Sequence, residues 1–256
     1  MKNHRHLLGA AALAVALLLP SVLLAGQPRV KSRTGTYQSS NGNSGTFKTS
    51  TTSGPGSRQS STIWTNQNGQ SGDHASSSNW NKSTDSGSFS SSTTLIDGKS
   101  ASRNGTITET APNTYQIQGT QTGFNGQTST FDFTKTKSAS GSSTVGTITG
   151  PKGGVSTYDS TVTKTDNGYT RDTAITGPNG GQTTKDTTFT KSTGETVKNT
   201  ETTLADGQKT DRVVDTKYNA DGSGTRTVEY TGPDGKTQTR TETFSAPVIT
   251  PIPPKG

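Results

Sequence analysis

The sequence contains no cysteine among its 256 residues. This excludes the disulfides that usually reinforce small exported domains, and any thiolate metal site. Hydrophobic residues are also scarce, at 23%. Ordering a chain costs about 1–2 kcal/mol of backbone entropy per residue, whereas burial of apolar area returns about 25 cal/mol per Å². A conventional globular core is therefore not expected, and the chain must be disordered or ordered by something other than a buried interior.

Long apolar runs are confined to residues 1–26. The stretch MKNHRHLLGAAALAVALLLPSVLLAG has a basic start and an apolar middle, which is typical of a secretory signal peptide. Its end resembles the start of a bacterial lipoprotein box, but Gln27 stands where the lipidated cysteine would be. No later segment approaches the roughly 18 apolar residues of a membrane span. The mature chain is therefore expected to be exported to the periplasm, the cell surface or the extracellular space, without a lipid anchor or a membrane span.

Charged residues make up only 17% of the chain. Without Lys2 and Arg5 of the signal segment, 23 basic and 18 acidic residues remain, a net charge near +5. The signs alternate along the chain and do not form the basic block of a nucleic-acid binder. Weak affinity for polyanions is expected, and no specific nucleic-acid partner.

Glycine is abundant and regularly spaced, and a second column of turn residues falls about midway between the members of the first. The segments TGPNG (176–180) and TGPDG (231–235) are typical of a type I turn with a glycine bulge. Proline presets φ, Asp or Asn suits the next position, and glycine accepts the left-handed conformation. The glycines that recur every 27 or 28 residues are therefore predicted to be structural turn residues: Gly98, Gly126, Gly153, Gly180, Gly207 and Gly235.

The segments between turns are rich in threonine and alternate with period two, which predicts β-strands. One face carries a threonine ladder together with a column of acids, Asp132, Asp159 and Asp186. The opposite face is thinly apolar, with phenylalanines interrupted by Lys135 and Lys185. The threonines that form the candidate binding face are Thr134, Thr136, Thr161, Thr163, Thr188 and Thr190.

The predicted fold is all-β: an elongated antiparallel meander of tandem hairpins, forming a single-layer sheet that is open to water on both faces. On the order of 16 strands at about 4.8 Å each would make a sheet roughly 75 Å wide. A β-solenoid is the alternative, although charges such as Lys135 and Arg240 would interrupt its interior. A transmembrane barrel would need an outward apolar band with aromatic girdles, which so few aromatic residues do not supply.

The organisation that follows has four parts. Residues 1–26 form the signal peptide, and 27–93 are degenerate repeats rich in Ser, Asn and Gly that are either partly paired or disordered. The clear threonine-rich hairpin repeats span 94–244. The proline-rich end, 245–256, is expected to be an extended tail, because proline cannot donate to a β-ladder.

No catalytic, cofactor or metal-binding residue is predicted. His74 is the only histidine beyond the signal segment, and a lone histidine in a polar stretch is ordinarily solvated. The acid column offers ordinary hydrogen bonding, and NADGSG (219–224) lacks an acid at the first position of a calcium loop. Trp64 and Trp80 are interpreted as a local packing anchor, with a small carbohydrate platform as the alternative.

The threonine rows resemble the ice-binding face of β-solenoid antifreeze proteins, although in a meander such rows recur only on alternate strands and sheet twist spoils a flat match. The tandem TGPxGxT units of residues 94–244 also resemble uncharacterised exported Thr/Gly-rich repeat proteins of proteobacteria. That resemblance covers over half the chain, and its motif consists mostly of turn residues. It implies export and repetition, and it transfers no active-site residue.

The function expected from these features is that of an exported, non-enzymatic repeat protein. An extended β-sheet scaffold would serve a structural or adhesive role in the envelope or extracellular matrix, and its open edges would allow assembly with further copies. Expected partners are therefore the protein itself and envelope or matrix polysaccharide. The alternatives are a threonine-ladder protein that binds ice or polysaccharide, and a flexible, disordered secreted chain.

Overall fold

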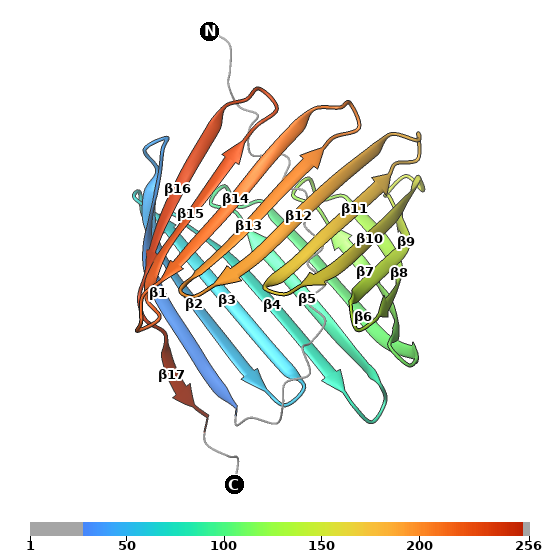
Figure 1. Cartoon of the computed structure of the whole chain (residues 1–256), viewed down its shortest axis with the longest axis horizontal. Helices are drawn as coiled ribbons and strands as arrows, with labels where there is room; N and C mark the ends of the chain where they lie inside the picture. The colour runs from blue at the N-terminus through green and yellow to red at the C-terminus, as the bar shows by residue number, and fades with distance from the viewer. Residues whose placement is uncertain (1–27, 253–256) are drawn as a thin grey trace.

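The computed structural model describes residues 28–252, so the expected signal peptide lies outside the described residues (Figure 1). All the regular secondary structure of this part is β-strand, as the sequence predicted. Within it, no helix has the length and apolar character needed to cross a membrane. The strands are β1 (Arg29–Ser39), β2 (Ser44–Gly54), β3 (Ser57–Asn66), β4 (Ser71–Asn81), β5 (Ser86–Thr94), β6 (Ser100–Ala111), β7 (Thr114–Thr122), β8 (Thr128–Lys137), β9 (Gly141–Thr149), β10 (Val155–Thr165), β11 (Gly168–Thr176), β12 (Gln182–Ser192), β13 (Glu195–Thr203), β14 (Lys209–Tyr218), β15 (Gly224–Thr231), β16 (Thr237–Phe244) and β17 (Val248–Pro251).

Each strand from β1 to β15 pairs antiparallel with the strand that follows it, so one sequence repeat corresponds to one hairpin. The six glycines of the first column lie in the turns with φ between +73° and +82°, a conformation that glycine adopts without steric cost. Each closes its turn with a backbone hydrogen bond, as from the Gly180 N–H to the Gly177 carbonyl (2.9 Å). Local turn chemistry therefore accounts for the order of the strands.

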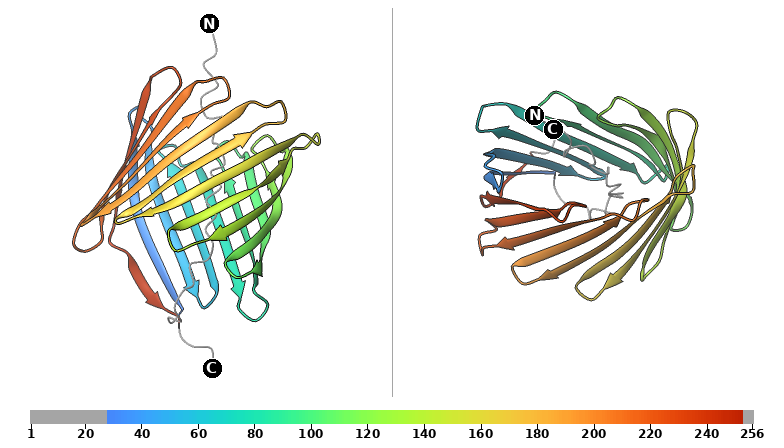
Figure 2. Two further views of the ribbon diagram at one scale, coloured as in Figure 1. Left: turned by 45° about the vertical axis from the view of Figure 1, so that its right-hand side comes forward. Right: turned by 90° about the horizontal axis from the view of Figure 1, so that it is seen from above.

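The sheet closes on itself, which the sequence analysis did not predict. Residues 35–39 of β1 pair antiparallel with residues 240–244 of β16, while the other edge of β1 pairs with β2. The result is a 16-strand antiparallel barrel, visible as a ring of strands from above (Figure 2). The open meander and the β-solenoid are therefore both wrong. Sheet twist and coiling bring the first and last strands together, and their pairing satisfies backbone groups that an open sheet would leave unpaired.

The two ends of the chain complete this seam. Residues 29–32 of β1 pair with β17, so β16 and β17 together cover most of one edge of β1. The Ser245 N–H donates to the Thr34 carbonyl between them (2.9 Å). Thus Val248–Pro251, expected to belong to an extended tail, forms a short strand, and the serine-rich segment 27–93 contributes five regular strands.

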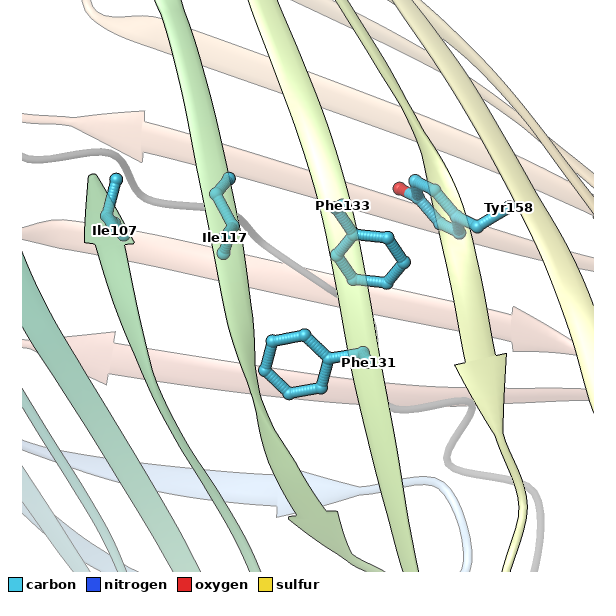
Figure 3. Packing of buried hydrophobic residues seen from close by; sticks show 5 residues of the cluster. All are labelled: Ile107, Ile117, Phe131, Phe133 and Tyr158. Carbon is cyan, nitrogen blue, oxygen red and sulfur yellow. The ribbon is translucent and has the colours of Figure 1, made fainter. Parts of the chain in front are cut away.

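The interior is packed most tightly around β6 to β10, where the ring bends most sharply in the view from above (Figure 2). A buried cluster there has members less than 6% exposed, drawn in Figure 3: Ile107, Ile117, Phe131, Phe133 and Tyr158. Glycines opposite the rings make room for them. Gly119 lies opposite Phe131, and Gly146 lies opposite both Phe133 and Tyr158. The aromatic side chains therefore lie across neighbouring strands and cover their backbone.

Candidate anion-binding interior

The strand register assigns every side chain to one of two faces, because directly paired residues point to the same side of a sheet. On β8, Phe131, Phe133 and Lys135 are buried, whereas Thr130 and Asp132 are exposed. Following the register from Phe133 through Gly146 to Tyr158, and onward around the ring, gives one consistent face that returns to β1 at Gly35 opposite Phe244. This more covered face, which carries the aromatic cluster, is the inner wall of the barrel.

Charge is segregated between the two faces. Every arginine carried by a strand faces inward, and the only lysines of the strands that face outward are Lys48, Lys209 and Lys217. The acids are distributed the opposite way: on the strands, only Glu109 and Glu242 face inward. The inward cations are Arg29, Lys31, Arg33, Arg58, Arg103, Lys135, Lys137, Lys164, Arg171, Lys185, Lys191, Lys198, Arg212, Arg226 and Arg240.

Several of these cations are covered by aromatic rings. The Arg103 guanidinium lies 4.2 Å from the centroid of the Phe131 ring and 5.5 Å from that of Phe89. It is only 7% exposed, and its Nε and one terminal nitrogen have no hydrogen-bond partner among the described residues. Burial lowers the pKa of Arg103 to about 10, so it remains charged at neutral pH. Cation–π contact, worth up to about 2 kcal/mol when desolvated, partly offsets this burial.

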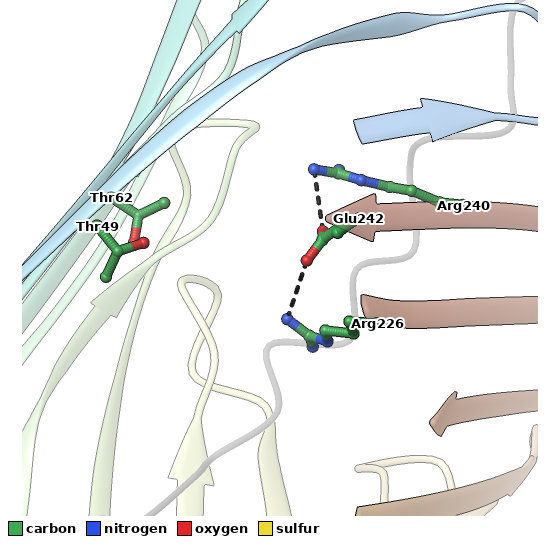
Figure 4. Close-up of polar contacts among 5 residues, drawn as sticks. All are labelled: Thr49, Thr62, Arg226, Arg240 and Glu242. Atoms are coloured by element: carbon green, nitrogen blue, oxygen red, sulfur yellow. Dashed lines mark hydrogen bonds and ion pairs between the residues drawn. The ribbon is translucent and has the colours of Figure 1, made fainter. Parts of the chain in front are cut away.

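Glu242 is the inward acid nearest the seam, and it is held between two arginines (Figure 4). Its Oε1 lies 3.1 Å from a terminal nitrogen of Arg240, and its Oε2 lies 3.5 Å from one of Arg226. The Arg240 guanidinium also stacks 4.1 Å from the Tyr37 ring centroid on β1. This group therefore ties β15 and β16 to β1, and a single carboxylate is shared by two cations.

The interior is accessible to water. Arg58, His74 and Arg212 all face inward by register, yet all three side chains are exposed. Threonine and serine hydroxyls line the same wall, as in the Thr49–Thr62 pair with 3.0 Å between hydroxyl oxygens (Figure 4). The inner wall thus combines an excess of positive charge with hydroxyl donors that solutes can reach.

The candidate threonine face lies on the outside of the barrel. All six predicted threonines face outward, and Thr163, Thr170 and Thr188 are direct neighbours across β10, β11 and β12. The predicted acids Asp132, Asp159 and Asp186 share this outer surface. The wall is convex and twisted, so the threonines do not form a flat lattice.

The two tryptophans do not form a pair. Trp64 lies opposite Gly72, whereas Trp80 lies opposite Gly87 and makes an edge contact with Tyr115 at 6.1 Å between ring centroids. His74 Nδ1 lies 2.9 Å from the Thr93 hydroxyl. Within residues 28–252, no three His, Asp or Glu side chains are placed to hold a metal ion.

Sequence reasoning missed the basic interior, although its signal was present. Lys135 and Lys185 alternate with phenylalanines on one face, and Asp132, Asp159 and Asp186 alternate with threonines on the other. The small net charge concealed this division. The missing information was which face closure would turn inward.

Comparisons with known proteins give a fold and no function. No protein-family model matches the chain, and no curated protein matches it. A solved structure described as "Asymmetric conductivity of engineered proteins" matches with a TM-score of 0.52 and 8% identity, covering 85% of this chain and 98% of that one. This chain is therefore similar to that protein in fold alone.

Proposed function

We propose that this chain is an exported, non-enzymatic β-barrel protein that binds anionic molecules through its inner wall. The observation that carries the proposal is the placement of all strand-borne arginines inside, with nearly all strand-borne acids outside. Like charges in a confined space raise the local potential and concentrate ions of opposite sign. An anion bound there would offset both the mutual repulsion of the cations and the cost of their burial.

The partner class that fits best is an acidic polysaccharide of the envelope or extracellular matrix, reached after export. The inward rings of Phe131, Phe133 and Tyr158 are at most 5% exposed, so they are not free to stack on a sugar or a base. Recognition would rest on charge and on hydroxyl donors. The sequence suggested a structural or adhesive role through assembly at the long edges of an open sheet. Barrel closure pairs these edges with each other, so in our proposal that role depends on binding by the interior.

Binding of dextran sulfate to the purified mature protein tests the proposal, with neutral dextran as the control ligand. We expect the protein to bind dextran sulfate and not neutral dextran. The affinity for dextran sulfate should fall steeply as the salt concentration is raised, because charge neutralisation releases ions. Replacing two inward lysines, as in K185Q/K198Q, should weaken binding. Replacing two outward lysines, as in K209Q/K217Q, removes the same charge and should not. Equal weakening by both pairs, or no binding by the wild type, would contradict the proposal.

A further inference from the structure

Four inward cations surround a pair of threonine hydroxyls on β11 to β14. Thr187 and Thr200 are direct partners, with 3.3 Å between their hydroxyl oxygens. On the neighbouring strand β11, Arg171 lies directly opposite Thr187, and on the neighbouring strand β14, Arg212 lies directly opposite Thr200. The row across the four strands therefore runs Arg171, Thr187, Thr200 and Arg212.

Two lysines complete the arrangement from the rows on either side. Lys185 precedes Thr187 by two residues on β12, and Lys198 precedes Thr200 by two residues on β13. Because β12 and β13 are antiparallel, the two lysines flank the threonine pair from opposite directions. We call these four cations and two threonines the β11–β14 cluster: Arg171, Lys185, Thr187, Lys198, Thr200 and Arg212.

No acid on β11 to β14 faces the four cations of this cluster. The inward Glu242 on β16 is close enough to act on Arg212, but its carboxylate is already shared by Arg226 and Arg240. The neighbouring acids Asp172, Asp186, Glu201 and Asp211 point to the outer face. Burial and then the positive charges of Arg171 and Arg212 lower the pKa of Lys185, and burial and then neighbouring cations lower that of Lys198. Thr187 is 5% exposed, and the buried Nε of Arg171 has no hydrogen-bond partner among the described residues. The cluster therefore combines repelling cations with an unsatisfied donor.

We infer that the β11–β14 cluster is a binding site for a tetrahedral oxyanion, a phosphate or sulfate group. Such a group has several acceptor oxygens, which match the guanidinium and ammonium donors that arrive from opposite sides and the less buried hydroxyl of Thr200 between them. Its charge would compensate cations that otherwise repel one another. The inference rests on the proposed function and narrows it from the whole inner wall to one position and one chemical group.

Isothermal titration of the mature protein with sodium phosphate and sodium sulfate at low salt tests the site. We expect saturable binding of at least one of these ions, weakened at least tenfold in K185Q/K198Q and retained in K185R/K198R. K164Q/K191Q neutralises two inward lysines outside the cluster and should weaken affinity much less than K185Q/K198Q does. The outward pair K209Q/K217Q is the matched control that should leave affinity unchanged. Thermal unfolding of each variant without ligand establishes that it folds.

A second arm separates a free ion from a group carried by a polymer. If the site serves free ions, inorganic phosphate or sulfate should displace dextran sulfate from the wild-type protein. The same ions should not displace dextran sulfate from K185Q/K198Q. If it serves esters on a polymer, dextran sulfate binding should fall more in K185Q/K198Q than in K164Q/K191Q. Equal losses in the two pairs would overturn the site while leaving the proposed function intact. Absence of binding to either kind of anion would overturn both.

Discussion

Lys135 illustrates how the barrel treats a charge in its tightest region. Its side chain is 8% exposed beside Phe133, and burial, followed by repulsion from Arg171 and Lys137, lowers its pKa from 10.5 to about 8. Below pH 8 the folded protein therefore carries the full cost of the buried ammonium. Between pH 8 and about 10.5 the unfolded chain binds more protons than the folded one at this position, so this residue's contribution to stability becomes more favourable as pH rises.

Replacing Lys135 by methionine should remove this cost while keeping a long apolar side chain. We expect K135M to be more stable than the wild type at pH 7 by about 1–3 kcal/mol, given about 1.4 kcal/mol per pKa unit. The difference should shrink between pH 8 and 10.5. Urea unfolding at several pH values measures it. Lower stability of K135M at pH 7 would show that the ammonium is compensated.

Asp186 illustrates repulsion on the outer wall. It lies directly opposite Asp172 on one side and Glu201 on the other, and like charges across strands cost about 0.2–1 kcal/mol. We expect D186T to stabilise the protein by about that amount at low salt, and by less in 1 M salt. Asp159 is the matched control, because it lies opposite Val145 and Ala174, so D159T should change stability little. Chemical unfolding at both salt concentrations compares the variants.

At the scale of strands, inward glycines are as necessary as the aromatic residues that cover them. A Cβ added to Gly146 on β9 would lie 2.7 Å from Cδ1 of Phe133 and would also meet the backbone of β8. We therefore expect G146V to destabilise the barrel by at least about 1–3 kcal/mol, the usual cost of overpacking. The adjacent Val145 points outward and is 46% exposed, so V145T should be nearly neutral. Thermal unfolding would separate the two, and equal values would contradict this account of the aromatic–glycine pairs.

For the whole molecule, the sequence predicts strands better than it predicts shape. Glycine spacing and turn chemistry are local, and they give the class, the antiparallel order and a strand number close to that observed. Closure depends on β1 recognising β16 and β17, which lie about 200 residues away, and no local pattern encodes that register. The basic interior follows only once closure is known, because alternation defines two faces without saying which is inside.

Closure can be tested directly, because the chain has no cysteine of its own. Thr36 on β1 and Thr243 on β16 are direct partners across the seam, and both point outward. Paired residues have Cα atoms about 4.5–5.5 Å apart, within reach of a disulfide. We expect T36C/T243C to form an intramolecular disulfide under mild oxidation and to resist thermal unfolding more than its reduced form.

The control pair is T36C/T190C, whose cysteines lie on β1 and β12, with four strands between them around the ring through β16. Neighbouring strands are separated by about 4.8 Å, so this pair lies too far apart to bridge in the barrel. In an open sheet the first and sixteenth strands would be roughly 70 Å apart, and neither pair would bridge within one chain. Non-reducing electrophoresis of dilute protein thus distinguishes the barrel from the open sheet. The barrel predicts a disulfide-bridged monomer for T36C/T243C and none for T36C/T190C, because no other arrangement of this meander places Thr36 beside Thr243.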